Sequence, residues 1–220
     1  MKLTERIKIF IKLFLVSTFC ALMFRLFVVE DYRIVSNSMF PTLLVGDLTF
    51  VSKSAFNIRV PFSSYEVIKF DRPGRGEIVA FTLPDKGVDT FVKRVVGIEG
   101  DKIQVKNHQL LVNGQPLQYS DSPMGTTLHP IDKTKFILET NPAKIAYTIQ
   151  VNESVLNDYG PVDVPKGHFF AMGDNRGDSV DSRMWGPVPY SCLKGRLAMV
   201  WLSLTENGAI RFSRFGTLVR

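Results

Sequence analysis

The chain has 220 residues, of which 45% are hydrophobic and 22% charged, and its formal net charge is +6. This composition excludes a disordered chain and suffices for one or two globular domains. The positive charge shows no long basic run and no interleaved basic and aromatic residues, so we predict no nucleic-acid partner. An anionic membrane surface is a simpler partner for the positive charge.

The first predicted element is a hydrophobic segment over residues 9–29. Its length is close to the roughly 20 residues that a helix needs to cross a bilayer. Basic residues dominate residues 1–8, whereas Glu30 and Asp31 follow the segment directly. The positive-inside rule therefore predicts a cytoplasmic tail over 1–8, a transmembrane helix over 9–29 and an exported remainder. A cleaved signal peptide with residues 13–24 as its core is the alternative, but no Ala-x-Ala pattern follows.

A short stretch with two serines, residues 36–43, begins seven residues after this segment. If the stretch begins extended, the side chains of Ser36 and Ser38 leave one side of the backbone, because side chains alternate along a strand. Ser38 can then attack a carbonyl carbon while Ser36 donates to the oxygen that becomes negative. The alternative is a simple turn, since Ser, Asn and Pro are frequent turn residues.

Beyond residue 30 the sequence predicts β-structure. Short runs rich in Val, Ile and Phe are bounded by Gly, Pro, Asn and Asp, which is typical of strands. These runs cover residues 46–52, 77–83, 91–98, 102–105, 109–112, 167–172 and 196–204. No long helical stripe follows residue 30, apart from a turn at 189–193. We therefore expect an all-β fold of antiparallel sheets, with a more polar subdomain inserted within residues 113–165.

Lys93 lies within one of these strongly apolar strands, where its neighbour Arg94 should point to the opposite face. A free lysine has a pKa near 10.4, so only about one in 2500 is neutral at pH 7. Removal of water can lower that pKa by about 3 units, which would let Lys93 take a proton from a serine hydroxyl. The alternative is a lysine whose ammonium group reaches from the strand into water.

Residues 173–189 concentrate small, acidic, basic and hydroxyl side chains. Ser179 can share a hydrogen bond with a neutral lysine amine and fix its direction. Asp181 and Arg183 are spaced to pair along one side of an extended segment and to hold Ser179 in place.

Histidine is the usual base for a nucleophilic serine, and the chain has three: His108, His129 and His168. His168 opens a predicted strand shortly before Asp174, so a Ser–His–Asp triad stays open at this point. No Gly-x-Ser-x-Gly motif accompanies Ser38.

Taken together, three motifs resemble those of the type I signal peptidases, or leader peptidases. A Ser-x-Ser-Met-x-Pro-Thr-Leu motif covers residues 36–43, and a Lys-Arg motif covers 91–97. Gly-Asp-Asn-Arg and Ser-x-Asp-Ser-Arg motifs follow within 173–189. The order of the motifs, their approximate spacing and the preceding apolar segment also match.

The resemblance implies a catalytic β core over residues 30–101 and 167–220, interrupted by a smaller β subdomain over 102–166. It implies an endopeptidase that removes N-terminal signal peptides from exported preproteins at a lipid bilayer. The enzyme would cross the plasma membrane once, with a cytoplasmic N-terminus and its catalytic domain on the outer face. The sequence contains no metal-ligand cluster, phosphate loop or nucleotide fingerprint, so we predict no cofactor.

Carried over by motif position, Ser38 is the nucleophile and Lys93 the general base of a Ser/Lys dyad that forms an acyl-enzyme. The resemblance assigns the oxyanion hole to the Ser38 backbone N–H and the Ser36 hydroxyl. The supporting residues would be Ser179, which orients the lysine, with Asp181 and Arg183.

The resemblance also places the small −1 and −3 side chains of the substrate against apolar residues near the motifs. These residues are Ile34, Val35, Met39, Leu43, Ala80, Phe91 and Val92. Ala80 is smaller than the Val expected there, so we expect a roomier −3 pocket. Phe91 stands where a Tyr often occurs, which removes a hydroxyl from the pocket edge.

Two alternatives to a general signal peptidase remain. The first is a Ser/Lys peptidase dedicated to the maturation of one substrate in a secretion or conjugation system. The breadth of substrates that the enzyme cleaves would distinguish it from a general signal peptidase. The second is a membrane-anchored β-domain that only binds, its motifs serving as turns and ion pairs. Acylation of Ser38 by a serine-directed inhibitor, lost in Lys93→Ala, would separate a catalyst from such a binder.

Overall fold

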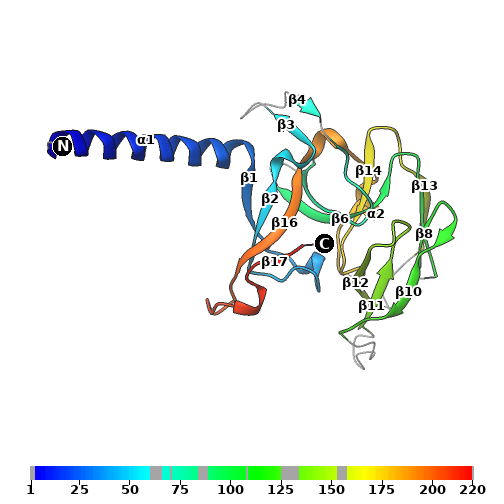
Figure 1. The fold of residues 1–220 in the computed structure, drawn as a ribbon. Coiled ribbons are helices and arrows are strands. Elements are labelled where there is room, and N and C mark those ends of the chain that lie inside the picture. The colour runs from blue at the N-terminus through cyan, green and yellow to red at the C-terminus, as the bar shows by residue number, and fades with distance from the viewer. Residues whose placement is uncertain are drawn as a thin grey trace.

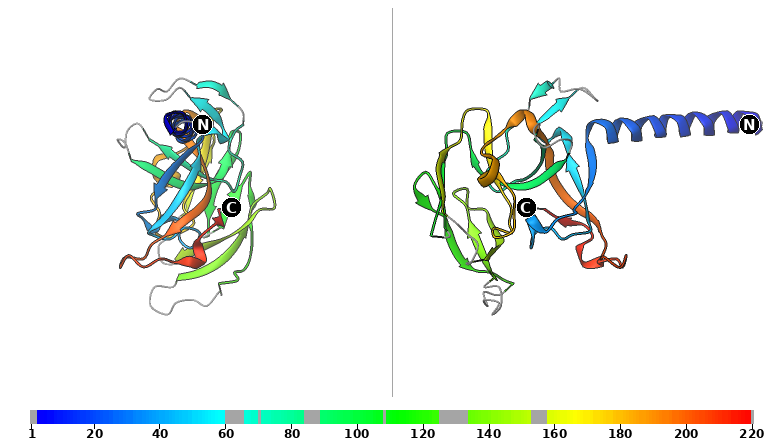
Figure 2. Two further views of the ribbon diagram at one scale, coloured as in Figure 1. Left: turned by 60° about the vertical axis from the view of Figure 1, so that its left-hand side comes forward. Right: turned by 180° about the vertical axis from the view of Figure 1, so that it is seen from behind.

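The computed structural model describes residues 3–59, 66–69, 71–83, 89–107, 109–124, 134–152 and 158–219. These residues form one long helix, α1 (Leu3–Phe27), followed mainly by strands (Figure 1). Figures 1 and 2 both show α1 projecting away from the β-structure. The predicted all-β fold of antiparallel sheets behind an apolar helix is confirmed.

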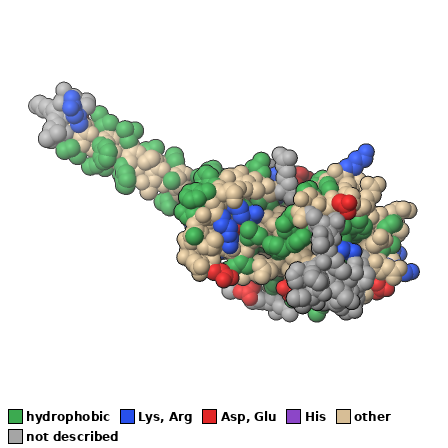
Figure 3. Space-filling view, turned by 90° about the horizontal axis from the view of Figure 1, so that it is seen from below, with side chains coloured by type: hydrophobic (Ala, Val, Ile, Leu, Met, Phe, Trp, Pro, Cys, Tyr) green, Lys and Arg blue, Asp and Glu red, His purple; other side chains and the backbone are tan. Residues whose placement is uncertain are grey.

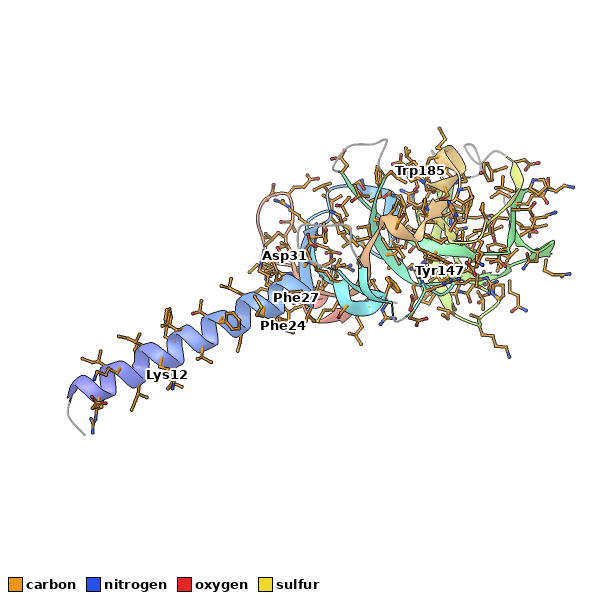
Figure 4. All side chains as sticks on the ribbon, turned by 90° about the horizontal axis from the view of Figure 1, so that it is seen from above. Lys12, Phe24, Phe27, Asp31, Tyr147 and Trp185 are labelled. Atoms are coloured by element: carbon orange, nitrogen blue, oxygen red, sulfur yellow. The ribbon has the colours of Figure 1, made fainter. Side chains whose placement is uncertain are left out.

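The helix α1 is long and apolar enough to cross a membrane over Glu5–Phe27, and none of this span is buried against the rest of the chain. Figure 3 shows hydrophobic side chains along its length. The helix ends two residues before the end of the predicted span, because Val29 already begins strand β1 (Val29–Arg33). Asp31 lies where helix and strand meet, next to the end of α1 at Phe27 (Figure 4). Its carboxylate pairs with Arg25 at 3.0 Å. The chain leaving the helix is therefore an ordered strand.

The largest sheet joins both ends of the β region. Its order is β1, β2 (Asp47–Ser52), β16 (Leu193–Ser203), β5 (Ile78–Thr82), β6 (Thr90–Ile98), β14 (His168–Met172) and β15 (Val188–Pro189). A short strand, β17 (Thr217–Leu218), pairs with β16. Strand β16 comes from the last third of the chain and lies between β2 and β5, so it joins the strands of the N-terminal part of the β region into one sheet.

The remaining strands form three smaller sheets. The four-stranded sheet contains β13 (Tyr159–Asp163), β7 (Lys102–Lys106), β8 (Gln109–Val112) and β9 (Gln115–Pro116). The three-stranded sheet contains β10 (Gln118–Asp121), β11 (Thr134–Thr140) and β12 (Ala146–Asn152), and the two-stranded one β3 (Asn57–Arg59) and β4 (Glu66–Lys69). Strands β7 to β13 all fall within residues 102–166, and the boundaries of the predicted insertion stay a prediction.

Each predicted strand is present, with ends that differ by up to three residues. The turn predicted at 189–193 contains the 3₁₀ helix η4 (Tyr190–Cys192). Two further 3₁₀ turns are η2 (Lys53–Ala55) and η5 (Phe212–Arg214). The structure adds a one-turn helix, α2 (Ser182–Trp185), which periodicity misses because four residues carry no repeat.

Strand β6 is buried on both faces. Val95 packs in one apolar cluster with Val79, Phe81 and Phe169, whereas Val96 packs in another with Phe170 of β14 and Ile103 of the insertion. A third cluster lies beneath the Ser38 segment and contains Ile34, Met39, Leu43, Val51, Ile78, Ala80, Leu197 and Val200. Successive side chains of a strand alternate between faces, so polar residues of β6 are also forced into the interior.

Candidate active site

The segment around Ser38 combines both conformations considered for it. Ser36 is extended (φ −131°, ψ 155°), whereas Asn37–Met39 forms a 3₁₀ turn, η1. The Oγ atoms of Ser36 and Ser38 lie 3.2 Å apart. Met39 and Leu43 are buried, and the Leu43 N–H donates to the Met39 carbonyl at 2.9 Å. This buried anchor holds the two hydroxyls together at the surface of the core.

Lys93 reaches Ser38 from strand β6. Its Nζ lies 2.5 Å from Ser38 Oγ, and only 4% of the residue is exposed. Burial lowers the pKa of Lys93 to about 8, although the Asp181 and Asp174 carboxylates act in the opposite direction. With that pKa about one lysine in ten is neutral at pH 7, against about one in 2500 for a free lysine. The amine is thus suited to accept the serine proton.

Arg94, the next residue, is fully buried in a different environment. Its Nε and Nη2 donate to the Asp174 carboxylate at 2.8 and 2.7 Å, and its guanidinium lies 3.9 Å from the Tyr147 ring centroid. Thr42 Oγ1 donates to the same carboxylate at 2.5 Å. Burial alone would lower the pKa of Arg94, but Asp174 raises it above its ordinary value. This ion pair joins all three sequence motifs, and sequence reasoning missed it.

Gly173 and Asn175 hold the Ser38 backbone. The Asn175 N–H donates to the Ser38 carbonyl at 3.1 Å, and Asn175 Nδ2 donates to the Asn37 carbonyl at 3.3 Å. A β-carbon at Gly173 would collide with the Ser38 carbonyl and with Ser179. Close backbone approach therefore requires glycine at 173. The only sequence signal for this role was the glycine that opens the third motif.

Asp181 is fully buried and paired with Arg183. Arg183 Nε and Nη2 each donate to its carboxylate at 2.8 Å, and the Gly173 N–H donates at 3.0 Å. Burial raises the pKa of Asp181, but the charge and hydrogen bonds of Arg183, together with hydrogen bonds from Gly173 and Ser179, lower it overall. Arg183 Nη2 also donates to the Ser179 carbonyl at 3.3 Å. The Asp181–Arg183 ion pair thereby holds the backbone of both Gly173 and Ser179 in place.

The Ser179 hydroxyl is buried, and the described residue that it affects is Asp181, whose pKa it helps to lower. The Ser179 side chain lies against Gly173, next to the Ser38 carbonyl. The hydrogen bond expected between Ser179 and Lys93 is not formed in this structure. The orienting role of Ser179 stays a prediction.

A second buried ion pair connects the third motif to the insertion. Arg176 donates to Glu139 of β11 through Nη1 and Nη2, at 2.7 and 2.6 Å. The hydroxyls of Tyr119 and Tyr147 donate to the same carboxylate at 3.0 and 2.8 Å. Sequence reasoning missed Glu139, which fixes the smaller sheets relative to Ser38.

The predicted substrate-pocket residues do not all lie together. Ile34, Met39, Leu43 and Ala80 share one buried cluster, and Val92 packs against it. Val35 is 79% exposed. Phe91 belongs to a different cluster, where its ring packs against Phe81 and Trp185. The assignment of these residues to the −1 and −3 pockets stays a prediction.

The histidine alternative has little structural support. The His168 ring contacts the carbonyl of Lys166 through Nδ1 at 3.0 Å, whereas Ser38 Oγ is hydrogen-bonded to Lys93 Nζ. His108 and His129 lie outside the residues that the structure describes.

A serine hydroxyl in contact with a buried amine on an all-β scaffold defines a candidate nucleophilic hydrolase. The family model for signal peptidase, peptidase S26, matches residues 7–202. The chain therefore belongs to the signal peptidase family, and it is a serine endopeptidase. This membership decides against the non-catalytic alternative.

The chain is similar to curated proteins named signal peptidase I. The Pseudomonas fluorescens protein is 33% identical, with coverage of 94% of this chain and 78% of the relative. The protein of Buchnera aphidicola subsp. Schizaphis graminum is 31% identical, with coverage of 91% and 78%. A crystal structure of signal peptidase I from Enterococcus faecalis is 25% identical and covers 59% of this chain and 99% of that one, with a TM-score of 0.39.

Proposed function

We propose that this chain is a membrane-anchored signal peptidase I that removes signal peptides from exported preproteins with a Ser38/Lys93 dyad. One observation carries the proposal: the Nζ of a lysine that is 4% exposed lies 2.5 Å from the Ser38 hydroxyl. The relatives named signal peptidase I support the substrate class.

In the proposed mechanism, neutral Lys93 accepts the Ser38 proton as Oγ attacks the scissile carbonyl carbon. The tetrahedral intermediate collapses when protonated Lys93 gives its proton to the departing amine, which leaves an acyl-enzyme. Water then attacks the acyl carbon, with Lys93 again taking the proton, and Ser38 is regenerated. The position of Nζ allows one amine to act as base and acid in both halves of the reaction.

The oxyanion formed in each half is proposed to bind the Ser38 backbone N–H and the Ser36 hydroxyl. The short distance between the two serine Oγ atoms supports this role, because Ser36 stands beside the atom that attacks. Ser179, Asp181 and Arg183 are proposed to hold Lys93 and Ser38 in register through Gly173.

Substrate choice is proposed to depend on the apolar residues beneath Ser38. Small −1 and −3 side chains would face the cluster that includes Ile34 and Ala80. A roomier −3 site at Ala80 predicts that Val at −3 is cleaved nearly as well as Ala. Cleavage of matched substrates by this enzyme and by Ala80→Val tests that expectation, and an unchanged Val-to-Ala ratio in the variant would refute it.

The helix α1 is proposed to anchor the enzyme with its N-terminus in the cytoplasm. Its apolar span and the basic residues before it support this orientation. Strand β1 follows directly, so the active site is held near the bilayer by a sheet edge. The plasma membrane, with the catalytic domain on its outer face, is the location in which exported substrates meet such a site.

The most informative test compares preprotein cleavage by wild type, Ser38→Ala and Lys93→Ala in one membrane preparation. We expect cleavage only by the wild type, and acylation of Ser38 by a serine-directed inhibitor that is lost in Lys93→Ala. Substantial cleavage by either variant would remove the dyad. A panel of unrelated preproteins separates a general signal peptidase from one dedicated to a single secretion or conjugation substrate.

A further inference from the structure

A polar pocket of about 380 Å³ is lined in part by Asn37, the residue that precedes Ser38. The nucleophile segment contributes Asn37 and Phe40, and the third motif contributes Asn175 and Asp178. Strand β12 of the insertion contributes Gln150 and Asn152. The volume is at the lower end of the range for ligand pockets, and side chains from three separate parts of the chain meet around it.

The walls of this pocket are fixed to one another by hydrogen bonds. The Asn175 N–H donates to the Ser38 carbonyl at 3.1 Å. The Gln150 N–H donates to the Asp174 carbonyl and the Arg176 N–H to the Gln150 carbonyl, both at 2.8 Å. These bonds form a short parallel bridge between β12 and the third motif. The pocket is therefore a built feature with a fixed position relative to the nucleophile.

The lining has a definite chemistry. Asn37, Gln150, Asn152 and Asn175 carry side-chain amides, which both donate and accept hydrogen bonds and so suit the main chain of a peptide. Asp178 is exposed at the pocket, and its carboxylate has no ion-pair partner among the described residues. An unpaired carboxylate favours a cationic ligand group and disfavours an anionic one.

The pocket also lies apart from the apolar cluster proposed for the −1 and −3 side chains. None of Ile34, Met39, Ala80 or Val92 lines it. A polypeptide with its scissile carbonyl at Ser38 must continue in two directions. With the apolar side assigned to the signal peptide, the polar pocket is left for the segment after the scissile bond.

We infer that this pocket binds the first residues of the mature polypeptide, on the leaving-group side of the scissile bond, and selects cationic over anionic side chains within positions +1 to +3. The inference rests on the proposed function. It gives the inserted β-subdomain a part in substrate binding, through Gln150 and Asn152.

The charge preference is tested with peptide substrates that differ only by Lys, Gln or Glu at +1, +2 or +3. For the full-length wild type we expect kcat/KM to favour Lys over Glu about two- to fivefold at one or more positions, the size of an exposed charge pair. Asp178→Asn should abolish this ratio and Asp178→Lys should reverse it. Asp163→Asn, which removes an exposed carboxylate of β13 outside the pocket, should leave it unchanged.

The amide lining is tested with Gln150→Ala, which keeps the backbone bridge. We expect this variant to raise KM several-fold for a substrate with four residues after the cut, but not for one that ends in an amide after +1. Equal KM changes for both substrates, or a Lys-to-Glu ratio near one in the wild type, would overturn the inference. Cleavage by Ser38→Ala in the same assay would instead remove the dyad, so the two failures are distinguishable.

Discussion

Lys93 and Arg94 are consecutive residues of β6, and both cations are buried, yet their surroundings differ in kind. Arg94 shares a carboxylate with Asp174 and lies over the Tyr147 ring. Lys93 contacts the uncharged hydroxyl of Ser38 and forms no ion pair within the described part of the chain. Burial of a charge is costly unless a partner compensates it, so the pKa of Arg94 is raised and that of Lys93 lowered.

The difference shows how the site keeps an amine reactive among carboxylates. Asp174 and Asp181 both attract the Lys93 charge, but each already accepts hydrogen bonds from an arginine, Arg94 or Arg183. The arginines thus limit the stabilisation left for a lysine ammonium. Arg94, on one face of β6, carries a permanent charge that is part of the folded core. The adjacent Lys93 supplies a base that titrates near neutral pH.

Replacement of the Lys93 amine by a guanidinium should have the largest effect on activity. Lys93→Arg places a group that cannot lose its proton beside Ser38, so we expect kcat/KM for preprotein cleavage to fall by about 10⁴-fold or more. Lys194→Arg is the matched control, because it makes the same exchange at a lysine of β16 that has no part in the proposed dyad and donates to Thr90 instead. Appreciable turnover by Lys93→Arg would mean that another group is the base.

Removal of the partner of Arg94 should mainly affect folding. Asp174→Asn leaves a buried guanidinium without its carboxylate, which typically costs about 3 to 5 kcal/mol of unfolding free energy. Denaturant unfolding measures this loss, with the exposed Asp163→Asn as control. A loss below about 1 kcal/mol would indicate that water or another group compensates Arg94.

Loss of the neighbouring hydroxyl should slow the reaction without abolishing it. If Ser36 donates to the oxyanion, Ser36→Ala should reduce kcat by roughly 10²- to 10³-fold, with little change in KM. Ser36→Thr retains a hydroxyl and should recover part of the rate. A rate for Ser36→Ala equal to wild type would exclude Ser36 from the oxyanion hole.

The smallest expected effect is a gain of stability in an inactive variant. The folded-state pKa of Lys93 is lowered from 10.5 to about 8, so its charged form destabilises the fold at low pH, and this cost fades as pH rises toward 10.5. Lys93→Met should raise the unfolding free energy by up to about 3 kcal/mol at pH 7 and by less than about 1 kcal/mol at pH 10. An equal gain at both pH values would point to packing alone.

The sequence was sufficient for the elements that depend on local pattern. Strands such as 109–112 were located because their apolar runs end at turn residues, and Ser38 and Lys93 were found because hydroxyl and amine stand in distinctive surroundings. The helix α2 had a signal that periodicity does not use, since Asp181 caps its first turn and Gly186 follows with φ 79°.

Pairs that depend on topology could not be predicted. Arg94 and Asp174 are 80 residues apart, and Glu139 reaches Arg176 only because the insertion folds back onto the third motif. Both partners of each pair look like ordinary surface charges in sequence. The role of Gly173 likewise depends on its contact with the Ser38 backbone, which is distant in the sequence.

The central claim, that Lys93 is a buried base beside Ser38, is tested most directly by titration of its amine. In ¹⁵N-lysine-labelled full-length enzyme in detergent, the Nζ resonance that is absent in Lys93→Met should titrate with a pKa of about 8. The kcat/KM of the wild type should rise up to tenfold per pH unit below that value and level off above it. A Lys93 pKa near 10.5, with a pH–rate profile that ignores it, would contradict this account.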